Sequence, residues 1–188
     1  MLITTTPLLG LKVLEPDIKK DNRGYFIEAY HQEKLAKVGI NNLFVQDNQS
    51  YSKQGTIRGL HYQLNPYAQT KLIRVVVGEI WDVAVDIRQG SPTFGIWEGI
   101  LLSADNQKQL LIPKGYAHGF VVISKYATVV YKCDNIYQPD AEAGIYCFDT
   151  QLRIDWKLNA PPLLSTKDQQ LPTFNQAVIN FTYEQATH

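Results

Sequence analysis

The sequence predicts an all-β protein, built as an antiparallel sandwich or barrel. Glycine and proline recur at short intervals along the 188 residues. The stretches between them have the length of strands and are rich in Val, Ile, Tyr and Phe, which favour strands. These stretches do not alternate regularly with helices, as the strands of a parallel sheet would. The chain is long enough to bury one sizeable core and short for two.

The individual elements follow from this pattern. The predicted strands span residues 11–15, 24–30, 43–51, 56–63, 71–77, 79–87, 96–102, 109–112, 119–123, 128–133 and 144–148. Short helices are predicted at residues 32–38, where Gly39 ends the helix, and in the segment after Ser165. The sequence at residues 76–80 is typical of a tight hairpin, in which Gly78 supplies a positive φ. We expect a single domain over residues 1–188, with a barrel core at about 43–150. The N-terminal strands and the C-terminal helical segment are expected to pack outside this core.

Composition excludes several classes of partner. Lys plus Arg and Asp plus Glu both number 18, so the net charge is zero and gives no general attraction for nucleic acid or an anionic membrane. No run approaches the roughly 18 apolar residues of a membrane helix, and no basic segment precedes the first apolar residues. The chain has two cysteines, Cys133 and Cys147. Two cysteines in a chain without a signal peptide are more often reduced thiols than a disulfide. We therefore expect a soluble, cytoplasmic protein.

Two histidines and a lysine lie within or beside apolar strands. His61 lies in Gly-Thr-Ile-Arg-Gly-Leu-His-Tyr-Gln, residues 55–63, which otherwise has the character of a buried strand. Lys71 opens the apolar run 72–77, and His118 precedes the strand at 119–123. Polar groups are costly to bury without partners, so two imidazoles and an ammonium in one barrel indicate a reaction site.

The motifs around these residues resemble a known family. Pro113, Gly115 and His118 form a Pro-x-Gly-x-x-His signature similar to the second motif of the cupin (double-stranded β-helix, jelly-roll) barrels, and His61 with Gly78 resembles a degenerate first motif. From about residue 14 to 172, the chain resembles the dTDP-4-dehydrorhamnose 3,5-epimerases. The matching blocks are residues 21–28, 44–48, 58–63, 77–88, 91–94, 112–120, 131–132 and 165–168.

The resemblance implies an isomerase that needs no cofactor or metal. Its substrate would be a dTDP-linked 4-keto-6-deoxy sugar, dTDP-4-dehydro-6-deoxy-D-glucose. Inversion at C3 and C5 would give dTDP-4-dehydro-L-rhamnose, in dTDP-L-rhamnose biosynthesis. The resemblance also implies a homodimer. The block at residues 21–48 carries candidate ligand residues ahead of the barrel, and such a segment can lie across a neighbouring subunit and cover an exposed edge.

Removing a proton next to a ketone and returning it on the opposite face requires a base, a stabiliser for the enolate oxygen and an acid. His61 is the candidate base, since a histidine side chain can be neutral and basic near neutral pH. Lys71 is the candidate that binds the C4 oxyanion, and Tyr131 is the candidate acid. The resemblance implies that Asp168 is the partner of His61. Residues 165–168 also fit a helix-capping box, which would give Asp168 a purely structural role.

The resemblance adds a set of substrate-binding candidates. Arginine forks and lysine suit phosphate oxygens, whereas amides and carboxylates suit sugar or base. The candidates are Arg23, Arg58 and Lys167 for the diphosphate, His118, Glu28, Gln46, Asn48 and Glu142 for polar contacts to the substrate, and Tyr137 for stacking on the pyrimidine.

Two features of strand parity bear on the site. Arg58 and His61 point to opposite faces of a regular strand, so if both contact the ligand, Gly59 marks a bulge or the strand starts later. Asp82 and Asp86 share one face of their predicted strand. Paired carboxylates can act as acid and base, but a polar inward row that supports the site is the favoured interpretation.

Three other functions compete with this one. A metal-dependent cupin would need a His-x-His pair and a carboxylate, whereas this chain has His61-Tyr62-Gln63 and then Lys71, a poor divalent site. A non-catalytic binder could dispense with His61, Lys71, Tyr131 and Asp168, which are all present. The third alternative is an epimerase that inverts only C3 or only C5 of a related nucleotide sugar. The number of carbons inverted depends on small shifts in how the sugar is bound, and the motifs do not distinguish these enzymes.

Overall fold

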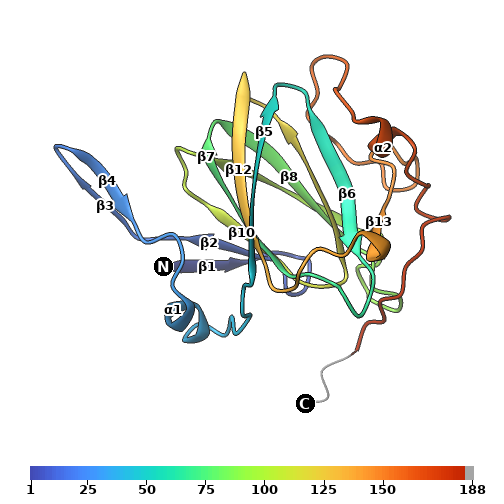
Figure 1. Ribbon diagram of the computed structural model, residues 1–188, viewed down its shortest axis with the longest axis horizontal. Helices are drawn as coiled ribbons and strands as arrows, with labels where there is room; N and C mark the ends of the chain where they lie inside the picture. The colour runs from blue at the N-terminus through green and yellow to red at the C-terminus, as the bar shows by residue number, and fades with distance from the viewer. Residues whose placement is uncertain (185–188) are drawn as a thin grey trace.

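Two antiparallel β-sheets face each other and form a jelly-roll barrel in the computed structural model, which describes residues 1–184 (Figure 1). The six-stranded sheet has the order β1 (Leu2–Thr5), β2 (Lys12–Glu15), β10 (Gln109–Ile112), β7 (Lys71–Val77), β12 (Tyr126–Cys133), β5 (Gln46–Lys53). The five-stranded sheet has the order β13 (Glu142–Gly144), β6 (Ile57–Gln63), β11 (Tyr116–Val122), β8 (Glu79–Asp86), β9 (Trp97–Ser103). The helices are α1 (Gln32–Ala36), α2 (Thr166–Gln169) and a 3-10 turn at Pro139–Ala141. The prediction of an all-β barrel with a few short helices is confirmed.

The core fills the space between the sheets. Strand β8 shows how the alternation of the sequence builds it: Ile80 and Ala84 point inward and join the central apolar cluster, whereas Val83 and Val85 point outward. The outward face of the five-stranded sheet is also buried, because the C-terminal segment crosses it with Trp156 and other apolar side chains. The five-stranded sheet is therefore buried on both faces.

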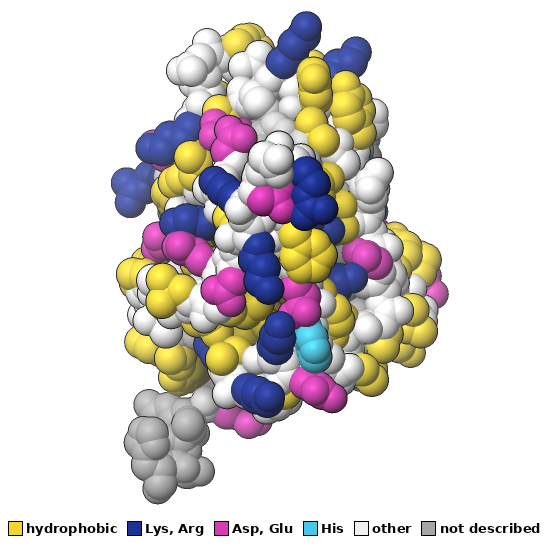
Figure 2. All heavy atoms as spheres, turned by 90° about the vertical axis from the view of Figure 1, so that its left-hand side faces the viewer, with side chains coloured by type: hydrophobic (Ala, Val, Ile, Leu, Met, Phe, Trp, Pro, Cys, Tyr) yellow, Lys and Arg dark blue, Asp and Glu magenta, His cyan; other side chains and the backbone are white. Residues whose placement is uncertain are grey.

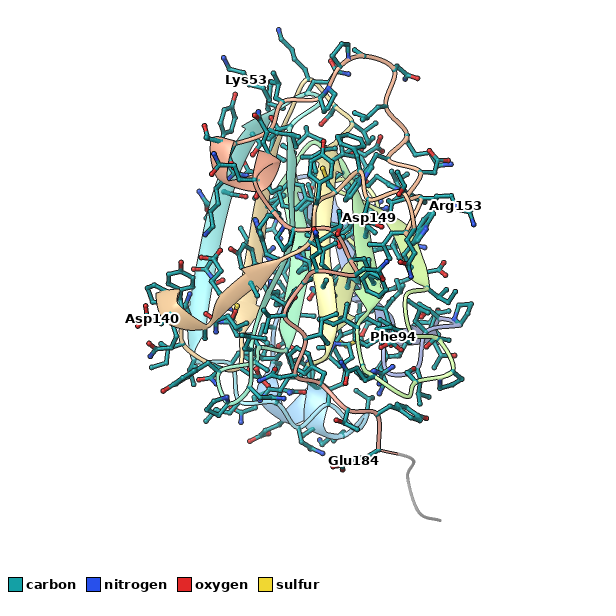
Figure 3. The ribbon with its side chains drawn as sticks, turned by 90° about the vertical axis from the view of Figure 1, so that its right-hand side faces the viewer. Lys53, Phe94, Asp140, Asp149, Arg153 and Glu184 are labelled. Atoms are coloured by element: carbon teal, nitrogen blue, oxygen red, sulfur yellow. The ribbon has the colours of Figure 1, made fainter. Side chains whose placement is uncertain are left out.

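The C-terminal segment is held onto this sheet by polar contacts as well. Figure 3 shows it running from Arg153 to Glu184 along the side of the barrel. The buried Asp149 accepts hydrogen bonds from the backbone N–H of Leu152, at 3.0 Å, and of Phe174, at 2.9 Å. The ring of Phe174 packs 5.2 Å from that of Phe94, measured between centroids. These contacts hold the C-terminal segment against the sheet, and this segment includes α2.

The N-terminal strands depart from the sequence-based expectation. Strands β1 and β2 belong to the six-stranded sheet itself, rather than packing outside the barrel. A further strand, β3 (Ile18–Asp21), pairs only with β4 (Gly24–Ile27) in a hairpin that stands away from the barrel (Figure 1). No strand was predicted at β1 or β3. The residues of β3 are all exposed, so this strand lacks the apolar alternation that identifies a half-buried strand.

Other boundaries shift where backbone pairing begins or ends. Strand β11 starts at Tyr116 rather than residue 119, because Gly115 makes the turn with φ +85° and Tyr116 already pairs with Asp86. The strand predicted at 144–148 is β13, which ends at Gly144. Ile145 still exchanges backbone hydrogen bonds with Leu60, but the next residue, Tyr146, turns to the carbonyl of Pro172. The predicted helix at 32–38 is shorter, at Gln32–Ala36.

The surface mixes both signs of charge. On the face that carries the β3–β4 hairpin, basic and acidic side chains lie beside each other (Figure 2). Arg23 pairs with Asp21 at 2.6 Å, and Lys132 pairs with Asp47 at 2.8 Å. Within residues 1–184, no helix is long and apolar enough to cross a membrane.

Candidate active site

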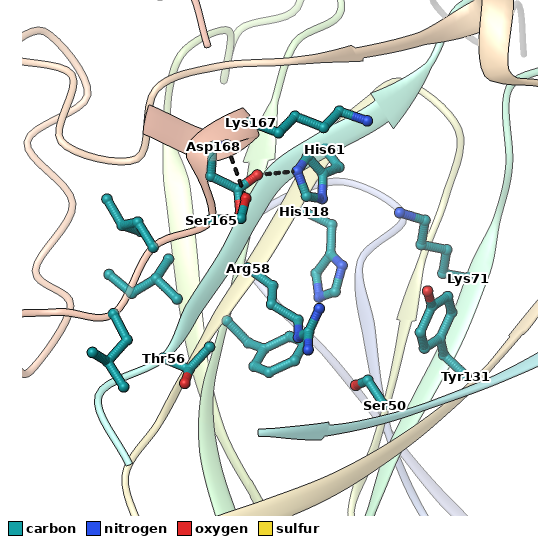
Figure 4. Close-up of a pocket in the computed structure, with 14 residues that line it drawn as sticks. Ser50, Thr56, Arg58, His61, Lys71, His118, Tyr131, Ser165, Lys167 and Asp168 are labelled. Carbon is teal, nitrogen blue, oxygen red and sulfur yellow. Dashed lines mark hydrogen bonds and ion pairs between the residues drawn. The ribbon is translucent and has the colours of Figure 1, made fainter. Parts of the chain in front are cut away.

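Two adjoining cavities open between the sheets. The first, of about 490 Å³, is lined by both sheets and by the C-terminal segment around α2. The second, of about 280 Å³, lies toward β13 and the turn at Pro139–Ala141. His61, Lys71 and Tyr131 line both cavities and thus mark the place where they meet (Figure 4).

His61 is paired with Asp168. Its Nε2 lies 2.6 Å from Asp168 Oδ1, although the two residues are 107 positions apart. Burial raises the pKa of the Asp168 carboxyl, but the hydrogen bond and charge of His61 outweigh it, so the net pKa lies below the ordinary value. Because a carboxylate accepts at Nε2, the remaining ring nitrogen, Nδ1, is free to act as a base toward the cavity.

The capping role of the same segment is also real. Ser165 is the N-cap of α2, and its Oγ accepts from the backbone N–H of Asp168 at 3.0 Å. The cap uses the backbone of Asp168 and leaves its carboxylate for His61. The two interpretations of residues 165–168 are therefore compatible, and the cap helps to hold the carboxylate in place.

A bulge in β6 brings Arg58 and His61 to the same cavity. His61 pairs with His118 and Arg58 with Phe120, so two residues, Gly59 and Leu60, stand opposite Gly119 alone. Gly59 has φ +109°, and a Cβ there would lie 2.5 Å from the His118 carbonyl oxygen. A larger residue would clash, so glycine is required at this bulge. Strand parity left two alternatives, a bulge at Gly59 or a later start of the strand, and the structure shows the bulge.

His118 is held by a buried carboxylate behind it. Its Nε2 lies 2.9 Å and 3.1 Å from the two oxygens of Asp82, which is fully buried. Burial lowers the pKa of His118 below its ordinary value despite the opposing effect of Asp82. The neutral ring thus donates from Nε2–H to Asp82, which leaves Nδ1 as an acceptor.

The two acidic residues of β8 hold other side chains in place. This agrees with the interpretation that they form an inward polar row supporting the site. Asp82 fixes His118, as described above. Asp86, further along the strand, accepts from Arg88 at 2.7 Å and from Ser91 and Thr93 at 2.6 Å each. Neither carboxylate lines either cavity.

Lys71 and Tyr131 face the cavity from the six-stranded sheet, on the wall opposite His61. Lys71 begins β7 and Tyr131 lies on the adjacent strand β12, in register with Ile73. Burial lowers the pKa of Lys71, while the nearby carboxylates of Asp82 and Glu142 act in the opposite direction. Burial raises the pKa of Tyr131, so its phenol stays protonated and can donate.

The second cavity holds most of the other predicted ligands. Gln46, Asn48, Tyr137 and Glu142 line it. Glu142 Oε2 accepts from Tyr137 Oη and from Lys167 Nζ, at 2.5 Å each. Because Lys167 also lines the first cavity, this hydrogen-bonded group connects the two cavities at their rim.

Two predicted residues lie apart from both cavities. Arg23 is on the β3–β4 hairpin and is largely exposed, paired with Asp21. Glu28 follows β4 and pairs with Lys34 at 2.7 Å. Within one chain, these residues are not brought to the site, because the hairpin points away from the barrel (Figure 1).

Several lining residues were not predicted. Strand β5 alternates exposed and inward side chains, so Ser50 shares the face of Gln46 and Asn48 and could have been found from parity alone. Thr56, Leu163 and Leu164 also line the first cavity. The two leucines come from irregular chain, where no periodic signal marks a cavity wall.

The two cavity histidines do not belong to a metal-ligand cluster in the described part of the chain. Within residues 1–184, no group of three or more His, Cys, Asp or Glu is placed to hold a metal ion. Each of the two cavity histidines is instead tied to a single carboxylate. The donor set therefore fits acid–base chemistry.

Comparison with known proteins gives a consistent result. A family model described as dTDP-4-dehydrorhamnose 3,5-epimerase matches residues 5–176. The chain is 46% identical to the dTDP-4-dehydrorhamnose 3,5-epimerase of Salmonella typhimurium, over 95% of this chain and 98% of that one. It is 38% identical to a dTDP-4-dehydrorhamnose 3-epimerase of Streptomyces niveus, over 85% and 77%. A dTDP-6-deoxy-D-glucose-3,5-epimerase from Legionella pneumophila, solved in complex with dTDP-4-keto-L-rhamnose, superposes with a TM-score of 0.93 at 45% identity, over 98% and 99%.

Proposed function

We propose that this chain, which belongs to the dTDP-4-dehydrorhamnose 3,5-epimerase family, inverts C3 and C5 of dTDP-4-dehydro-6-deoxy-D-glucose to give dTDP-4-dehydro-L-rhamnose. The enzyme is an isomerase, and the step belongs to dTDP-L-rhamnose biosynthesis. The observation that carries the proposal is the opposed placement of His61, backed by Asp168, and of Tyr131 beside Lys71, around one cavity.

The geometry supports a stepwise acid–base mechanism. C3 and C5 both neighbour the C4 ketone, so loss of a proton from either gives an enolate. His61 Nδ1 takes the proton, and Asp168 stabilises the imidazolium that forms. The Lys71 ammonium binds the oxygen on which negative charge develops. Tyr131 then delivers a proton from the opposite wall, which inverts the carbon.

The binding residues divide between the two cavities. Arg58 and Lys167 line the first cavity and are proposed to hold the diphosphate. Gln46, Asn48 and Glu142 line the second and offer hydrogen bonds to sugar or base, while Tyr137 offers a ring for stacking on the pyrimidine. The neutral His118 contributes an acceptor at Nδ1, which suits a sugar hydroxyl.

Solvent exchange tests the reaction directly. Incubation with dTDP-4-dehydro-6-deoxy-D-glucose in deuterated water is expected to place deuterium at both C3 and C5, as followed by NMR. Deuterium at only one of the two carbons would instead support a mono-epimerase, 3-only or 5-only, as the second candidate; one relative, from Streptomyces niveus, is a 3-epimerase. Deuterium at neither carbon would contradict the proposed substrate.

We also propose a cytoplasmic homodimer. Cys133 and Cys147 are both free thiols, as is usual in a reducing compartment. The β3–β4 hairpin exposes Tyr25 and Phe26, which are 56% and 65% exposed, beside Arg23. A second copy placed under this hairpin would cover the aromatic side chains and bring Arg23 and Glu28 to its cavity.

Light scattering at micromolar concentration is expected to give twice the mass of one chain. Phe26→Asp is expected to shift the mass toward the monomer and to weaken dTDP binding, because a buried apolar contact becomes a buried charge. Arg23→Ala serves as the control, since it should weaken dTDP binding without changing the mass. A wild-type monomer with full activity would contradict the shared site.

A further inference from the structure

The last described residues of the chain form a strap across one end of the barrel. Residues 178–183, which we call the C-terminal strap, lie beyond every motif of the site and form neither a helix nor a strand. Figure 3 shows the segment that ends at Glu184 at the end of the barrel away from Lys53. An isolated bridge joins Thr182 to Gln89, so the strap is held by parts of the chain that are distant in sequence.

Two sets of hydrogen bonds clamp the strap to the barrel. On one side, the backbone N–H of Asn65 donates to Asn180 Oδ1 at 3.0 Å, and Asn180 Nδ2 donates to the Asn65 carbonyl at 3.1 Å. On the other side, the backbone N–H of Gln89 donates to the Phe181 carbonyl at 2.9 Å. The Gln89 carbonyl accepts from the backbone N–H of Tyr183, also at 2.9 Å. Phe181 is therefore fixed from both sides.

The ring of Phe181 is buried at this end of the barrel. It is 6% exposed, and its centroid lies 6.2 Å from that of the Tyr62 ring. Tyr62 in turn donates to the carbonyl of Val178 at 2.7 Å. Phe181 lines a small cavity of about 10 Å³, together with Lys71 and other side chains. This volume is at the lower limit of the roughly 10–15 Å³ that one water molecule needs.

The small cavity lies directly behind the candidate active site. Lys71 and His118 line both the small cavity and the first cavity, so they separate the two. Burial lowers the pKa of each of these side chains, which shows that both lie where water is largely excluded. An ammonium attracts a developing oxyanion more strongly in such surroundings than in water. Water admitted behind Lys71 would weaken that attraction.

We propose that Phe181 is a positioning residue for the reaction: clamped by the strap, its ring closes the barrel behind Lys71 and His118 and keeps water from both side chains. The proposal rests on the proposed function and extends it to a residue that lines neither substrate cavity. It also gives the strap a role, because the strap has no sequence motif yet holds one aromatic side chain against the site.

Replacement of Phe181 by alanine is expected to slow deuterium exchange at saturating substrate about 10-fold, less than the roughly 10²–10³-fold that loss of an oxyanion donor itself costs. Affinity for dTDP should stay at the wild-type value, since Phe181 lines neither substrate cavity. Phe181→Leu keeps an apolar side chain over the small cavity and should retain most of the rate. Exchange is followed by NMR, and affinity by calorimetry.

Phe174→Ala is the matched control. Phe174 is a similarly buried phenylalanine of the same C-terminal segment, but it packs against Phe94 and does not line the small cavity. Both alanine variants should lose melting temperature to a similar extent, because each leaves a cavity in place of a buried ring. Only Phe181→Ala should lose exchange rate.

Two results would overturn the proposal. One is wild-type exchange in a folded Phe181→Ala variant. The other is an equal loss of exchange in Phe174→Ala, because the effect would then follow from stability alone. If Phe181→Ala does not fold, Phe181→Val decides in the same way, with a smaller expected loss of rate. Absence of exchange in the wild type would instead contradict the proposed function, and this inference with it.

Discussion

Replacement of His61 by alanine is expected to stop deuterium exchange at both C3 and C5. The substitution removes a ring nitrogen that faces the cavity while the other nitrogen of the ring is held by the carboxylate of Asp168. General base catalysis is commonly worth about 10²–10⁴-fold. Affinity for dTDP should remain close to that of the wild type, because the base acts mainly on the reacting carbon in the transition state. Exchange is measured by NMR, and binding by calorimetry.

A second variant guards against a structural explanation of that loss. His61→Ala leaves the buried Asp168 carboxylate without its main partner, and the pKa of Asp168 should rise, since burial raises it and the interaction with His61 is the main one that lowers it. His61→Gln keeps an amide N–H that can reach Asp168 but has no basic nitrogen. Loss of exchange in both variants, with normal dTDP binding, would support the role of base. Near-normal turnover in either would show that another group removes the proton.

The sequence predicted the members of this site better than it predicted their pairing. His61, Lys71 and His118 stand out because each interrupts or borders an apolar strand. Asp168 stands 107 positions from His61, and no local pattern links them; only the family resemblance did. The pairing depends on how the C-terminal segment crosses the five-stranded sheet, which is a property of the tertiary fold.

The parity of strands proved informative on both sides of the cavity. The odd separation of Arg58 and His61 left open a bulge or a later start of the strand, and the structure places a bulge at Gly59. The same rule applied to β5 puts Ser50 on the face of Gln46 and Asn48, where it lines the first cavity. Parity reveals which residues share a wall, whereas only the hydrogen-bond pattern reveals that Ser50 lacks a partner.

The positions of Arg23 and Glu28 could not be predicted from one chain. Their motif matches the family, but the hairpin that carries Arg23 has no apolar face against its own barrel. Its aromatic side chains remain exposed, so in the proposed homodimer a second copy would bring these residues to a cavity. The prediction of a shared site therefore depends on assembly and not on the fold of the single chain.

Replacement of Tyr131 by phenylalanine is expected to uncouple proton removal from inversion. The variant keeps the ring and its packing but loses the hydroxyl that faces the cavity from β12. His61 lies on the opposite sheet and, with Lys71, can still form the enolate. The proton should then return from the face that it left. Deuterium would enter the substrate with its original configuration, while the epimer accumulates about 10²–10⁴-fold more slowly.

Tyr137→Phe is the matched control, because it removes a second cavity hydroxyl, one that bonds to Glu142 rather than facing His61. Tyr137→Phe should weaken substrate binding without changing the ratio of inversion to deuterium exchange. NMR of the recovered sugar nucleotide gives both inversion and exchange in one experiment. Burial raises the pKa of Tyr131, so its phenol stays protonated until the carbanion forms. Mildly alkaline pH should therefore not stop wild-type inversion through loss of the Tyr131 proton. If Tyr131→Phe inverts the sugar at the wild-type rate, Tyr131 serves only in packing, and the acid must be sought among the other groups of the first cavity.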